Sequence, residues 1–600
     1  MKISKYLFLF IITIALAAAL IFLPEANEIL YGVAILLFGV LTLERGVNKL
    51  AGSFLRKFLK KTTSTVNRSI WFGIISTSLL QSSALVSLVS ISFLSAGLIT
   101  LTSGIGIIFG ANIGTTTGAW LISYLGLKVN ISSFALPMVV FGVLFLLQRG
   151  NYLKGIGGFI AGVGFLFLGI HFMKIGFDTY TSTINLAQYA MPGFLGSIVY
   201  VGFGILITIL MQSSHGSLAI ILTALSFNQI TYQNALALAI GANIGTTFTA
   251  FLGALGSNVE GKRLAIAHLV FNLFTGIIAI AFINQFQIAV NFLSNKVGIQ
   301  ADDYVLKLSM FHTMFNLVGV LLMLPFIKYL ASQLTKRIKD RSQVDISVPK
   351  YLNESVLKYP ESAVAALLLE TRHLFNNAFE IIAHGLNLHR TDIFSDKKLK
   401  QIVSNSNKVM MVNIDDIYFR KVKSIYNKII EFATISQSGI MEERYVNKIH
   451  EIKVASRYIV EIVKHIKTLQ PNFAKYIVSE NEYIKKEYNI LRQKVAKAMR
   501  EIYRSYDAEN INQQYDKLSK LKRNARLHDV LLSGGLDNLI REKLILTEMA
   551  TSLMNDSGLI KRIIEKLIEV AELLYFDKDS VLLTEYHNEF EQSDEKYFEN

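Results

Sequence analysis

Up to about residue 330, the sequence contains a succession of apolar runs that are each close to 20 residues long. A helix of about 20 apolar residues is long enough to span the roughly 30 Å hydrocarbon core of a bilayer. Beyond about residue 350, apolar residues instead recur every three or four positions between charged ones, as in amphipathic helices. We therefore predict an all-α protein in which a polytopic membrane domain is followed by a soluble helical domain.

Two polar motifs each occur twice inside the apolar runs. "QSS" at 81–83 precedes "GANIGTT" at 110–116, and "QSS" at 212–214 precedes the same seven letters at 241–247. Matching residues of the two copies are 131 positions apart, and the preceding runs "GVAILLFG" and "GVGFLFLG" also align. The membrane domain is therefore an internal repeat.

Basic residues indicate how the chain is oriented. Residues 1–341 contain 22 Lys and Arg but 8 Asp and Glu, whereas the remainder contains 38 and 37. The surplus lies beside apolar runs, which places Lys2, Lys5 and the segments 45–68 and 336–341 in the cytoplasm by the positive-inside rule. Both termini are therefore expected in the cytoplasm, and the net charge of +15 requires no nucleic-acid partner.

The two repeats are expected to be inverted. The basic loop 45–68 corresponds to 175–196, whose only charged residue is Asp178, and this contrast favours opposite sides of the membrane. Inversion requires the segment 71–97 to enter and leave by one face, as a re-entrant hairpin. Non-helical backbone at membrane depth occurs only where protein or a water-filled cavity satisfies its hydrogen bonds. Interrupted helices at corresponding positions of two inverted halves typically mark a transport site.

The predicted divisions follow these changes along the chain. They are an N-terminal transmembrane helix (1–30), a first repeat (31–150), a second repeat with the last span (155–335), a basic linker (336–350) and a helical domain (351–600). A cleaved signal peptide is the alternative for the first span, but its apolar core exceeds the usual ~7–15 residues. "GSNVEGKR" at 256–263 has the frame of a phosphate-binding loop but ends in Arg, so we predict a basic loop between spans.

The repeated residues suit an oxyanion together with a small hard cation. Hydroxyls, amides and freed backbone N–H groups donate to phosphate oxygens, helix N-termini add partial positive charge, and amide and hydroxyl oxygens can coordinate sodium. The motifs contain no Lys or Arg, which suits a site that releases its ligand, and we expect no acidic side chain near them. Ser, Thr and Gly also serve close packing in membrane helices. The repeated Gln needs partners in hydrocarbon, which favours a binding function.

With these motifs the sequence resembles the type II sodium–phosphate cotransporters and their bacterial relatives. "QSSALVSL" with "GANIGTTTG", and "QSSHGSLAI" with "GANIGTTFT", match that family's motifs within about residues 30–330. The resemblance implies phosphate binding by Gln81, Ser82, Ser83, Gln212, Ser213 and Ser214. It implies supporting and sodium-binding roles for Asn112, Thr115, Thr116, Asn243, Thr246 and Thr247.

The sequence departs from the family's usual motif after QSS. Animal members usually have a third Ser, where this chain has Ala84 and His215. His215 either senses pH, contacts phosphate or is a hydrogen-bonded packing residue, and we favour packing. His268 and His312 are expected to be structural partners of backbone carbonyls, with a proton relay as the alternative.

Residues 351–600 are predicted to form a helical bundle with breaks at Pro471-Asn472 and Ser533-Gly534-Gly535. The order of helices resembles PhoU, a phosphate-uptake regulator fused to many bacterial sodium–phosphate cotransporters. PhoU proteins often bind metals through E-x-x-x-D, whereas the counterparts here are "EIKVA" and "NDSGL". We therefore expect no metal beyond sodium, and either a regulatory partner or a second copy of the chain at this domain.

The sequence as a whole is interpreted as a sodium-dependent transporter of inorganic phosphate in a bacterial inner membrane, working by alternating access. Two alternatives stay open: a phosphate exporter or sodium-independent anion conduit, and a membrane-anchored phosphate sensor that acts through the helical domain. No enzyme is expected, because nucleotide-binding, metal-cluster and nucleophile motifs are all missing, and no cofactor besides the coupling sodium is implied.

Overall fold

The computed structural model describes most of the chain as two compact units. The first contains Met1–Ser95 and Ile99–Lys339, and the second contains Asp340–Asn600 together with Ala96–Leu98. The described residues are 13, 17, 20–22, 27–62, 65–126, 132–181, 190–191, 193–339, 348–410, 413–438, 441–505, 511–527 and 535–576. The predicted first span, 1–30, lies almost entirely outside them.

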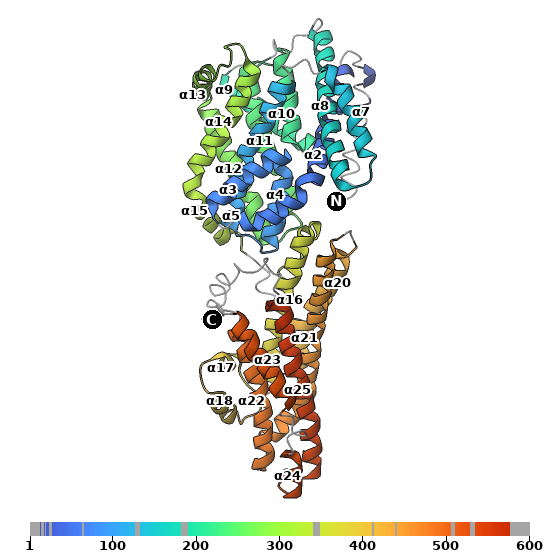
Figure 1. The fold of residues 1–600 in the computed structure, drawn as a ribbon. Coiled ribbons are helices and arrows are strands. Elements are labelled where there is room, and N and C mark those ends of the chain that lie inside the picture. Colours follow the sequence, from blue (N-terminus) through green and yellow to red (C-terminus); the bar gives the residue numbers. More distant parts are fainter. Residues whose placement is uncertain are drawn as a thin grey trace. The chain divides into compact units, whose positions relative to one another are not determined.

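The described part of the first unit is helical and has no β-strand (Figure 1). Its helices are α2 (Asn27–Thr62), α3 (Val66–Leu80), α4 (Ser83–Ser95), α5 (Leu101–Gly114), α6 (Thr116–Leu121), α7 (Ser132–Leu146), α8 (Asn151–Thr181), α9 (Gly193–Met211), α10 (Ser214–Ser226), α11 (Tyr232–Ala254), α12 (Val259–Ala281), α13 (Ile283–Lys296), α14 (Tyr304–Met323) and α15 (Ile327–Arg337). Within the described residues, 7 helices are long and apolar enough to cross a membrane. The predicted multi-pass, all-α membrane protein is therefore confirmed.

Helices α2 and α8 begin the two repeats, and they pack closely in antiparallel directions. Gly32 lies against Met173, and Gly46 lies against Phe159. A Cβ on Gly46 would be 2.4 Å from the backbone nitrogen of Phe159, so only glycine permits this approach. Because equivalent helices run in opposite directions, the repeats are inverted, as predicted.

Each QSS motif joins two helices that form a hairpin. Gly106 lies against Ser69 and Gly114 lies against Thr77, so α3 and α5 run parallel, and α4 between them must run back. The 15 residues of α3 and 13 of α4 correspond to about 22 and 20 Å, short of the roughly 30 Å core. The segment therefore enters and leaves on one side, which confirms the first re-entrant hairpin.

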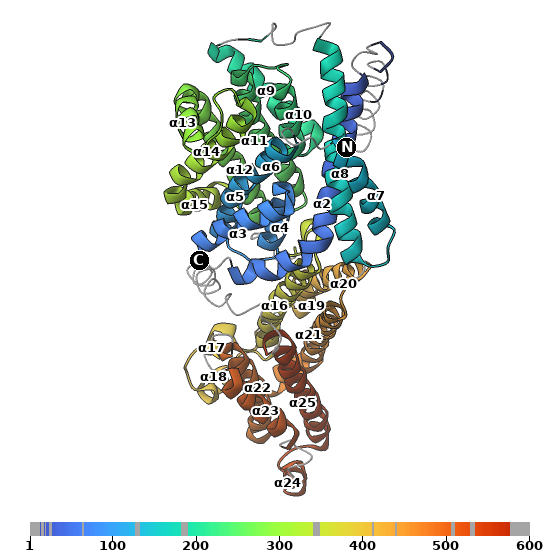
Figure 2. The ribbon, with the colours of Figure 1, turned by 45° about the horizontal axis from the view of Figure 1, so that its top comes forward.

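The second repeat forms the same kind of hairpin from α9 and α10. Parallel packing of α9 and α11 is fixed by contacts of Gly241 with Val201 and of Gly245 with Thr208. Figures 1 and 2 place α3 and α4 at one end of the first unit and α9 and α10 at the other. The hairpins thus approach the middle of the unit from opposite ends.

The predicted basic loop 45–68 is wrong, because α2 continues as a helix through Thr62. The segment contains good helix formers, and its apolar and basic residues alternate at three- and four-residue steps. Charge patterning located a basic segment beside the membrane but did not distinguish a loop from an amphipathic extension of the span.

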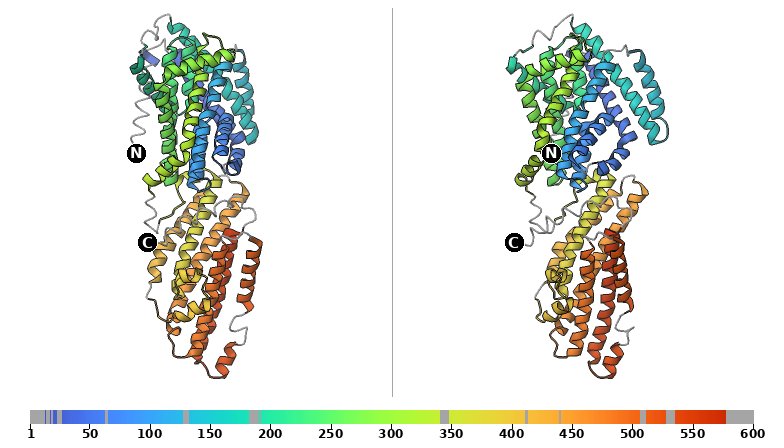
Figure 3. Two further views of the ribbon diagram at one scale, coloured as in Figure 1. Left: turned by 90° about the vertical axis from the view of Figure 1, so that its left-hand side faces the viewer. Right: turned by 60° about the vertical axis from the view of Figure 1, so that its left-hand side comes forward.

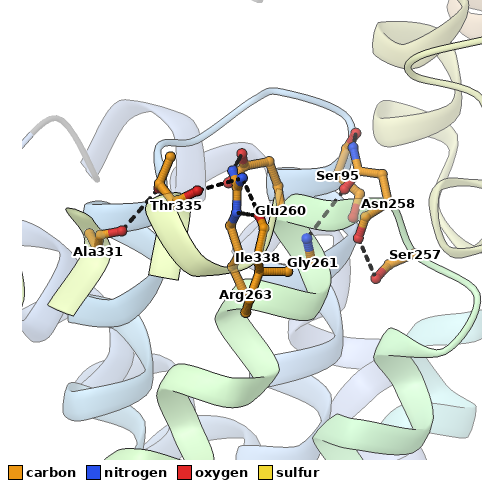
Figure 4. Close-up of polar contacts among 9 residues, drawn as sticks. All are labelled: Ser95, Ser257, Asn258, Glu260, Gly261, Arg263, Ala331, Thr335 and Ile338. Atoms are coloured by element: carbon orange, nitrogen blue, oxygen red, sulfur yellow. Dashed lines mark hydrogen bonds and ion pairs between the residues drawn. The ribbon is translucent and has the colours of Figure 1, made fainter. Parts of the chain in front are cut away.

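The segment 256–263 contains a loop between spans, as predicted, but this loop ends at Asn258, and α12 begins at Val259. Asn258 caps α12: its side chain accepts a hydrogen bond from the Gly261 N–H (3.2 Å) and donates to the Ser95 carbonyl (3.0 Å). Arg263, one turn later, pairs with Glu260 and donates to the Ile338 carbonyl at the end of α15 (Figure 4). The basic residue thus holds together the ends of two helices.

The second unit is also helical throughout its described residues. Its elements are η6 (Glu354–Lys358), α16 (Pro360–Gly385), α17 (Arg390–Phe394), α18 (Leu399–Asn405), α19 (Ile414–Ile417), η7 (Tyr418–Lys423), α20 (Ser424–Ser436), α21 (Glu443–Tyr476), α22 (Glu482–Arg504), α23 (Ile511–Leu527), α24 (Gly535–Arg541) and α25 (Thr547–Tyr575). Helix α21 packs on α16 and α25, and α22 and α23 also pack on α25. Figure 3 shows these long helices, coloured yellow to red, side by side in a bundle.

The predicted break at Pro471 is wrong, because α21 continues through it to Tyr476. A proline inside a helix costs roughly 3 kcal/mol. Here the next residue compensates by tertiary contact: Asn472 donates to the Asp556 carboxylate of α25 (2.8 Å), and Phe473 is buried. The second predicted break falls largely outside the described residues.

Candidate functional site

The two QSS glutamines occupy the same unusual backbone conformation. Gln81 ends α3 with φ of 51°, and Gln212 ends α9 with φ of 52°. This left-handed region costs an L-residue with a side chain about 1–2 kcal/mol. Each Gln N–H still donates to a threonine carbonyl four positions earlier, at 2.8 Å. Both helices are thus stopped in the same way at the hairpin tip.

The first serine of each motif starts the returning helix. The Ser82 hydroxyl oxygen accepts from the Leu85 N–H, and the Ser213 hydroxyl oxygen accepts from the Gly216 N–H, both at 3.3 Å. These are N-cap bonds, which satisfy one of the free N–H groups of a helix start. The second serine is the first residue of α4 or α10. Other N–H groups of the first turn therefore remain available at each tip.

Both tips border one small cavity. Its lining residues come from both repeats: Glu44, Ser82, Ser83, Ala84, Thr208, Gln212, Ser213, Ser214, His215, Thr246 and Thr249. The N-termini of α4 and α10 meet here, and each carries the partial positive charge of a helix start. No Lys or Arg is among the described lining residues. The cavity thus combines anion-attracting helix ends with neutral hydrogen-bonding groups.

Five of the six residues predicted to bind phosphate line the cavity, and Gln81 does not. The Gln81 side-chain nitrogen donates to the Thr117 hydroxyl (3.1 Å) and to the Ser78 carbonyl. Its amide thus fixes the hairpin tip to the start of α6, whereas Gln212 faces the cavity. The two glutamines share a backbone conformation but not a side-chain environment.

Of the six residues predicted to support the site, Thr246 alone lines the cavity. All four motif threonines donate to a backbone carbonyl three residues earlier in the chain, at 2.6–2.8 Å: Thr115, Thr116, Thr246 and Thr247. Asn112 likewise donates to the Ile108 carbonyl (2.8 Å). The GANIG glycines, meanwhile, allow α5 and α11 to approach α3 and α9. In this structure the motif mainly packs the helices behind the hairpins.

Asn243 forms a buried network that the sequence analysis missed. Its side-chain nitrogen donates to the side-chain oxygens of Asn272 (3.2 Å) and Asn316 (3.1 Å). Asn272 in turn donates to the Asn243 carbonyl (3.1 Å), and so α11, α12 and α14 are joined. The signal was present in the sequence as a second repeat, "HLVFNL" at 268–273 and "HTMFNL" at 312–317.

Glu44 corrects the expectation that no acidic side chain lies near the motifs. It lies on α2, is partly buried and lines the cavity together with Ser82. It was missed because it is a single charge at the end of an apolar run, 37 residues before the first QSS. Thr208 and Thr249 also line the cavity and were not predicted.

His215 lines the cavity, and its ring lies next to Gly118. The His215 Nε2 atom is buried and has no hydrogen-bond partner, and the same is true of Nδ1 in His268 and in His312. Within the described residues, these three ring nitrogens therefore have no hydrogen bond to a backbone carbonyl, and the packing role stays a prediction.

Comparison with known proteins gives one family. A model described as "Na+/Pi-cotransporter" matches residues 35–175 and 194–299. The "Putative inorganic phosphate export protein YjbB" of Escherichia coli K12 is 27% identical over 383 residues, 63% of this chain and 68% of its own length. The protein of that name from Salmonella typhimurium is 26% identical over 361 residues, 60% of this chain and 64% of its own length. The matched family and these relatives are transporters and not enzymes.

A shorter relative isolates part of the chain. The "Uncharacterized protein YqeW" of Bacillus subtilis is 27% identical over 297 residues, which are 49% of this chain and 92% of the relative. About half of this chain therefore accounts for nearly all of that protein. No solved structure matches the chain.

Proposed function

We propose that the chain is a member of the Na+/Pi-cotransporter family, whose model matches residues 35–175 and 194–299, and that it carries inorganic phosphate across a membrane together with sodium. The observation that supports this most directly is the meeting of two inverted hairpin tips at one cavity. The start of α4 and the start of α10 both line it. Two helix N-termini aimed at one space are a ready-made site for an oxyanion.

Phosphate is held by neutral donors in this proposal. The ligand is surrounded by the hydroxyls of Ser83 and Ser214, by the Gln212 amide and by free N–H groups in the first turns of α4 and α10. The N-cap serines Ser82 and Ser213 fix these turns in place. Because the described lining residues include no Lys or Arg, the attraction is moderate and the ligand can leave on either side.

Alternating access follows from the inverted architecture. The hairpins approach the cavity from opposite ends of the unit (Figures 1 and 2), so each is placed to close one route to it. Movement of one repeat relative to the other around a fixed site is the usual mechanism of inverted-repeat transporters. Sodium lowers the free energy of the phosphate-bound state by compensating its charge, which couples the two fluxes.

The proposed location is a bacterial inner membrane, with both termini in the cytoplasm. The basic residues at 2–5, 45–61 and 336–341 support this orientation through the positive-inside rule. The helical unit then lies in the cytoplasm as a PhoU-like regulatory domain that binds a partner protein or a second copy.

Export is the second candidate function, and the printed name of the YjbB relatives favours it. The two functions differ in their driving force. A sodium symporter carries phosphate down the sodium gradient, and so into a cell that keeps its sodium low. An exporter or conduit moves phosphate out without requiring that gradient.

Radiolabelled phosphate flux in proteoliposomes tests the proposal. We expect accumulation with an inward sodium gradient, little with an inward potassium gradient, and loss of uptake in Gln212→Ala. Equal flux with sodium and potassium would contradict sodium coupling and support an exporter or conduit. Phosphate binding without flux would instead support a sensor.

A further inference from the structure

Glu44 is the one carboxylate among the described residues that line the cavity. It lies on α2 and lines the cavity together with Ser82, whose hydroxyl is the N-cap of α4. The carboxylate thus lies at one hairpin tip, beside the space in which we place phosphate.

The position breaks the symmetry of the two repeats. With the offset of 130 that aligns α2 and α8, the counterpart of Glu44 is Lys174, which is exposed on α8. The QSS serines, by contrast, are identical in both repeats and line the cavity in both. One copy therefore adds a negative charge to the site, and the other adds no charge of either sign.

A carboxylate beside an oxyanion requires a cation. The two negative groups repel each other in a space shielded from water, and the described lining contains no Lys or Arg to compensate them. A buried charge without a partner is strongly unfavourable. Phosphate can therefore occupy the cavity with an ionised Glu44 only when a positive ion enters with it.

The neighbouring groups are those that a small, singly charged cation prefers. The Glu44 carboxylate is surrounded by neutral oxygen atoms, which belong to the Gln212 amide and to the hydroxyls of Ser82, Thr208, Ser213 and Thr246. Divalent hard cations commonly take several carboxylates. No group of three or more His, Cys, Asp or Glu occurs in the described part of the chain. One carboxylate among neutral oxygens matches the charge of sodium.

We propose that Glu44 is a ligand of the coupling sodium, and that with the Ser82 hydroxyl it holds this ion directly beside the phosphate. The inference rests on the proposed sodium-coupled function and identifies the residue that carries the coupling. Sodium bound at Glu44 cancels the repulsion and adds attraction for phosphate, and so each ligand raises the affinity for the other.

The test compares Glu44→Gln with the wild type in the full-length protein. Binding of radioactive sodium to the purified protein should weaken by at least about tenfold in Glu44→Gln. The affinity for radiolabelled phosphate should rise with sodium in the wild type and become nearly independent of sodium in the variant. Glu44→Asp, which keeps the charge, should recover part of both effects.

Asp178→Asn is the matched control, since it removes an exposed carboxylate from α8, the counterpart of α2. It should bind sodium and phosphate as the wild type does. Retained phosphate binding in Glu44→Gln shows that this variant is folded. Wild-type sodium affinity in Glu44→Gln overturns the inference and leaves sodium coupling intact. Phosphate transport by the wild type without any sodium dependence instead overturns the coupled function and the inference with it.

Discussion

The His215 ring of the second repeat lies directly against Gly118 of the first, so that a Cβ on Gly118 would be 2.0 Å from its Cδ2 atom. At the equivalent positions, 131 residues away, the chain has Ala84 for His215 and Thr249 for Gly118. Ala84, Thr249 and His215 all line the cavity. A large residue in one repeat is thus matched by a small one in the other.

Gly118→Ala should therefore disturb the site. The added methyl group cannot fit beside the buried ring, and overpacking of this kind costs about 1–3 kcal/mol. We expect phosphate uptake to fall by about tenfold, and the double variant Gly118→Ala/His215→Ala to recover most of it. Gly202→Ala is the control, because a Cβ there meets nothing within 4 Å. Failure of His215→Ala to rescue would show that another contact limits the site.

The N-cap serines should separate stability from binding. Ser213→Ala removes the cap of α10, and loss of a cap costs about 1 kcal/mol. Thr231→Ala removes the cap of α11 without touching the cavity. Both variants should lose similar thermal stability in detergent, but Ser213→Ala alone should weaken phosphate binding. Equal phosphate affinities in the two would contradict the placement of the site at the hairpin tip.

Asn243 and Asn112 stand at equivalent positions, and their replacement should have unequal effects. Asn243→Ala leaves the buried side-chain oxygens of Asn272 and Asn316 without their donor, which should cost about 2–4 kcal/mol. Asn112→Ala removes a bond within its own helix and should cost about 1 kcal/mol. Melting temperatures of the two variants in detergent test this. Equal losses would mean that the network contributes nothing beyond the helix.

Asp556 should make the helical unit more stable at mildly acidic pH. Burial raises the pKa of its carboxyl group, although hydrogen bonds from Tyr488 and Asn472 oppose this shift. The folded state therefore holds this proton to higher pH than the unfolded state does. Stability accordingly falls as pH rises from the unfolded pKa, about 3.9, through the folded one.

Hydrogen exchange of α21 and α25 in the full-length protein measures this effect. Protection, corrected for intrinsic exchange rates, should decline over that pH range in the wild type and remain flatter in Asp556→Asn. A parallel pH profile in the variant would show that other groups dominate. Asp537→Asn in α24 is a control, because Asp537 is exposed.

The sequence predicted what depends on periodicity and repetition. Apolar run length indicated the spans, and the offset of 131 indicated the repeats. The counterpart of a basic segment contains one charged residue, and this contrast indicated inversion. The QSS serines were identified because two copies of a costly motif in hydrocarbon require a common explanation. These features are local or symmetric, and one sequence is enough to display them.

What the sequence did not predict depends on single residues meeting across the fold. Glu44 reaches the cavity because α2 passes the tip of α4, and no spacing in the sequence encodes that contact. Gln81 and Gln212 are equivalent in the sequence, but the Gln81 amide donates to Thr117 and does not line the cavity. Pro471 stays inside a helix because its neighbour bonds to α25. In each case tertiary contact overrides the local signal.

In the glycine-lined contact of α2 with α8, equivalent faces of the two helices pack against each other. The interface of a two-fold symmetric dimer is built in the same way. A protein with a single repeat would present that face to another copy of itself inserted in the opposite direction. Joining both repeats in one chain ensures that one repeat is inserted in each orientation. The two repeats can then differ in sequence. The two repeats have indeed diverged: Glu44 is at the position equivalent to Lys174, and Ala84 is at the position equivalent to His215.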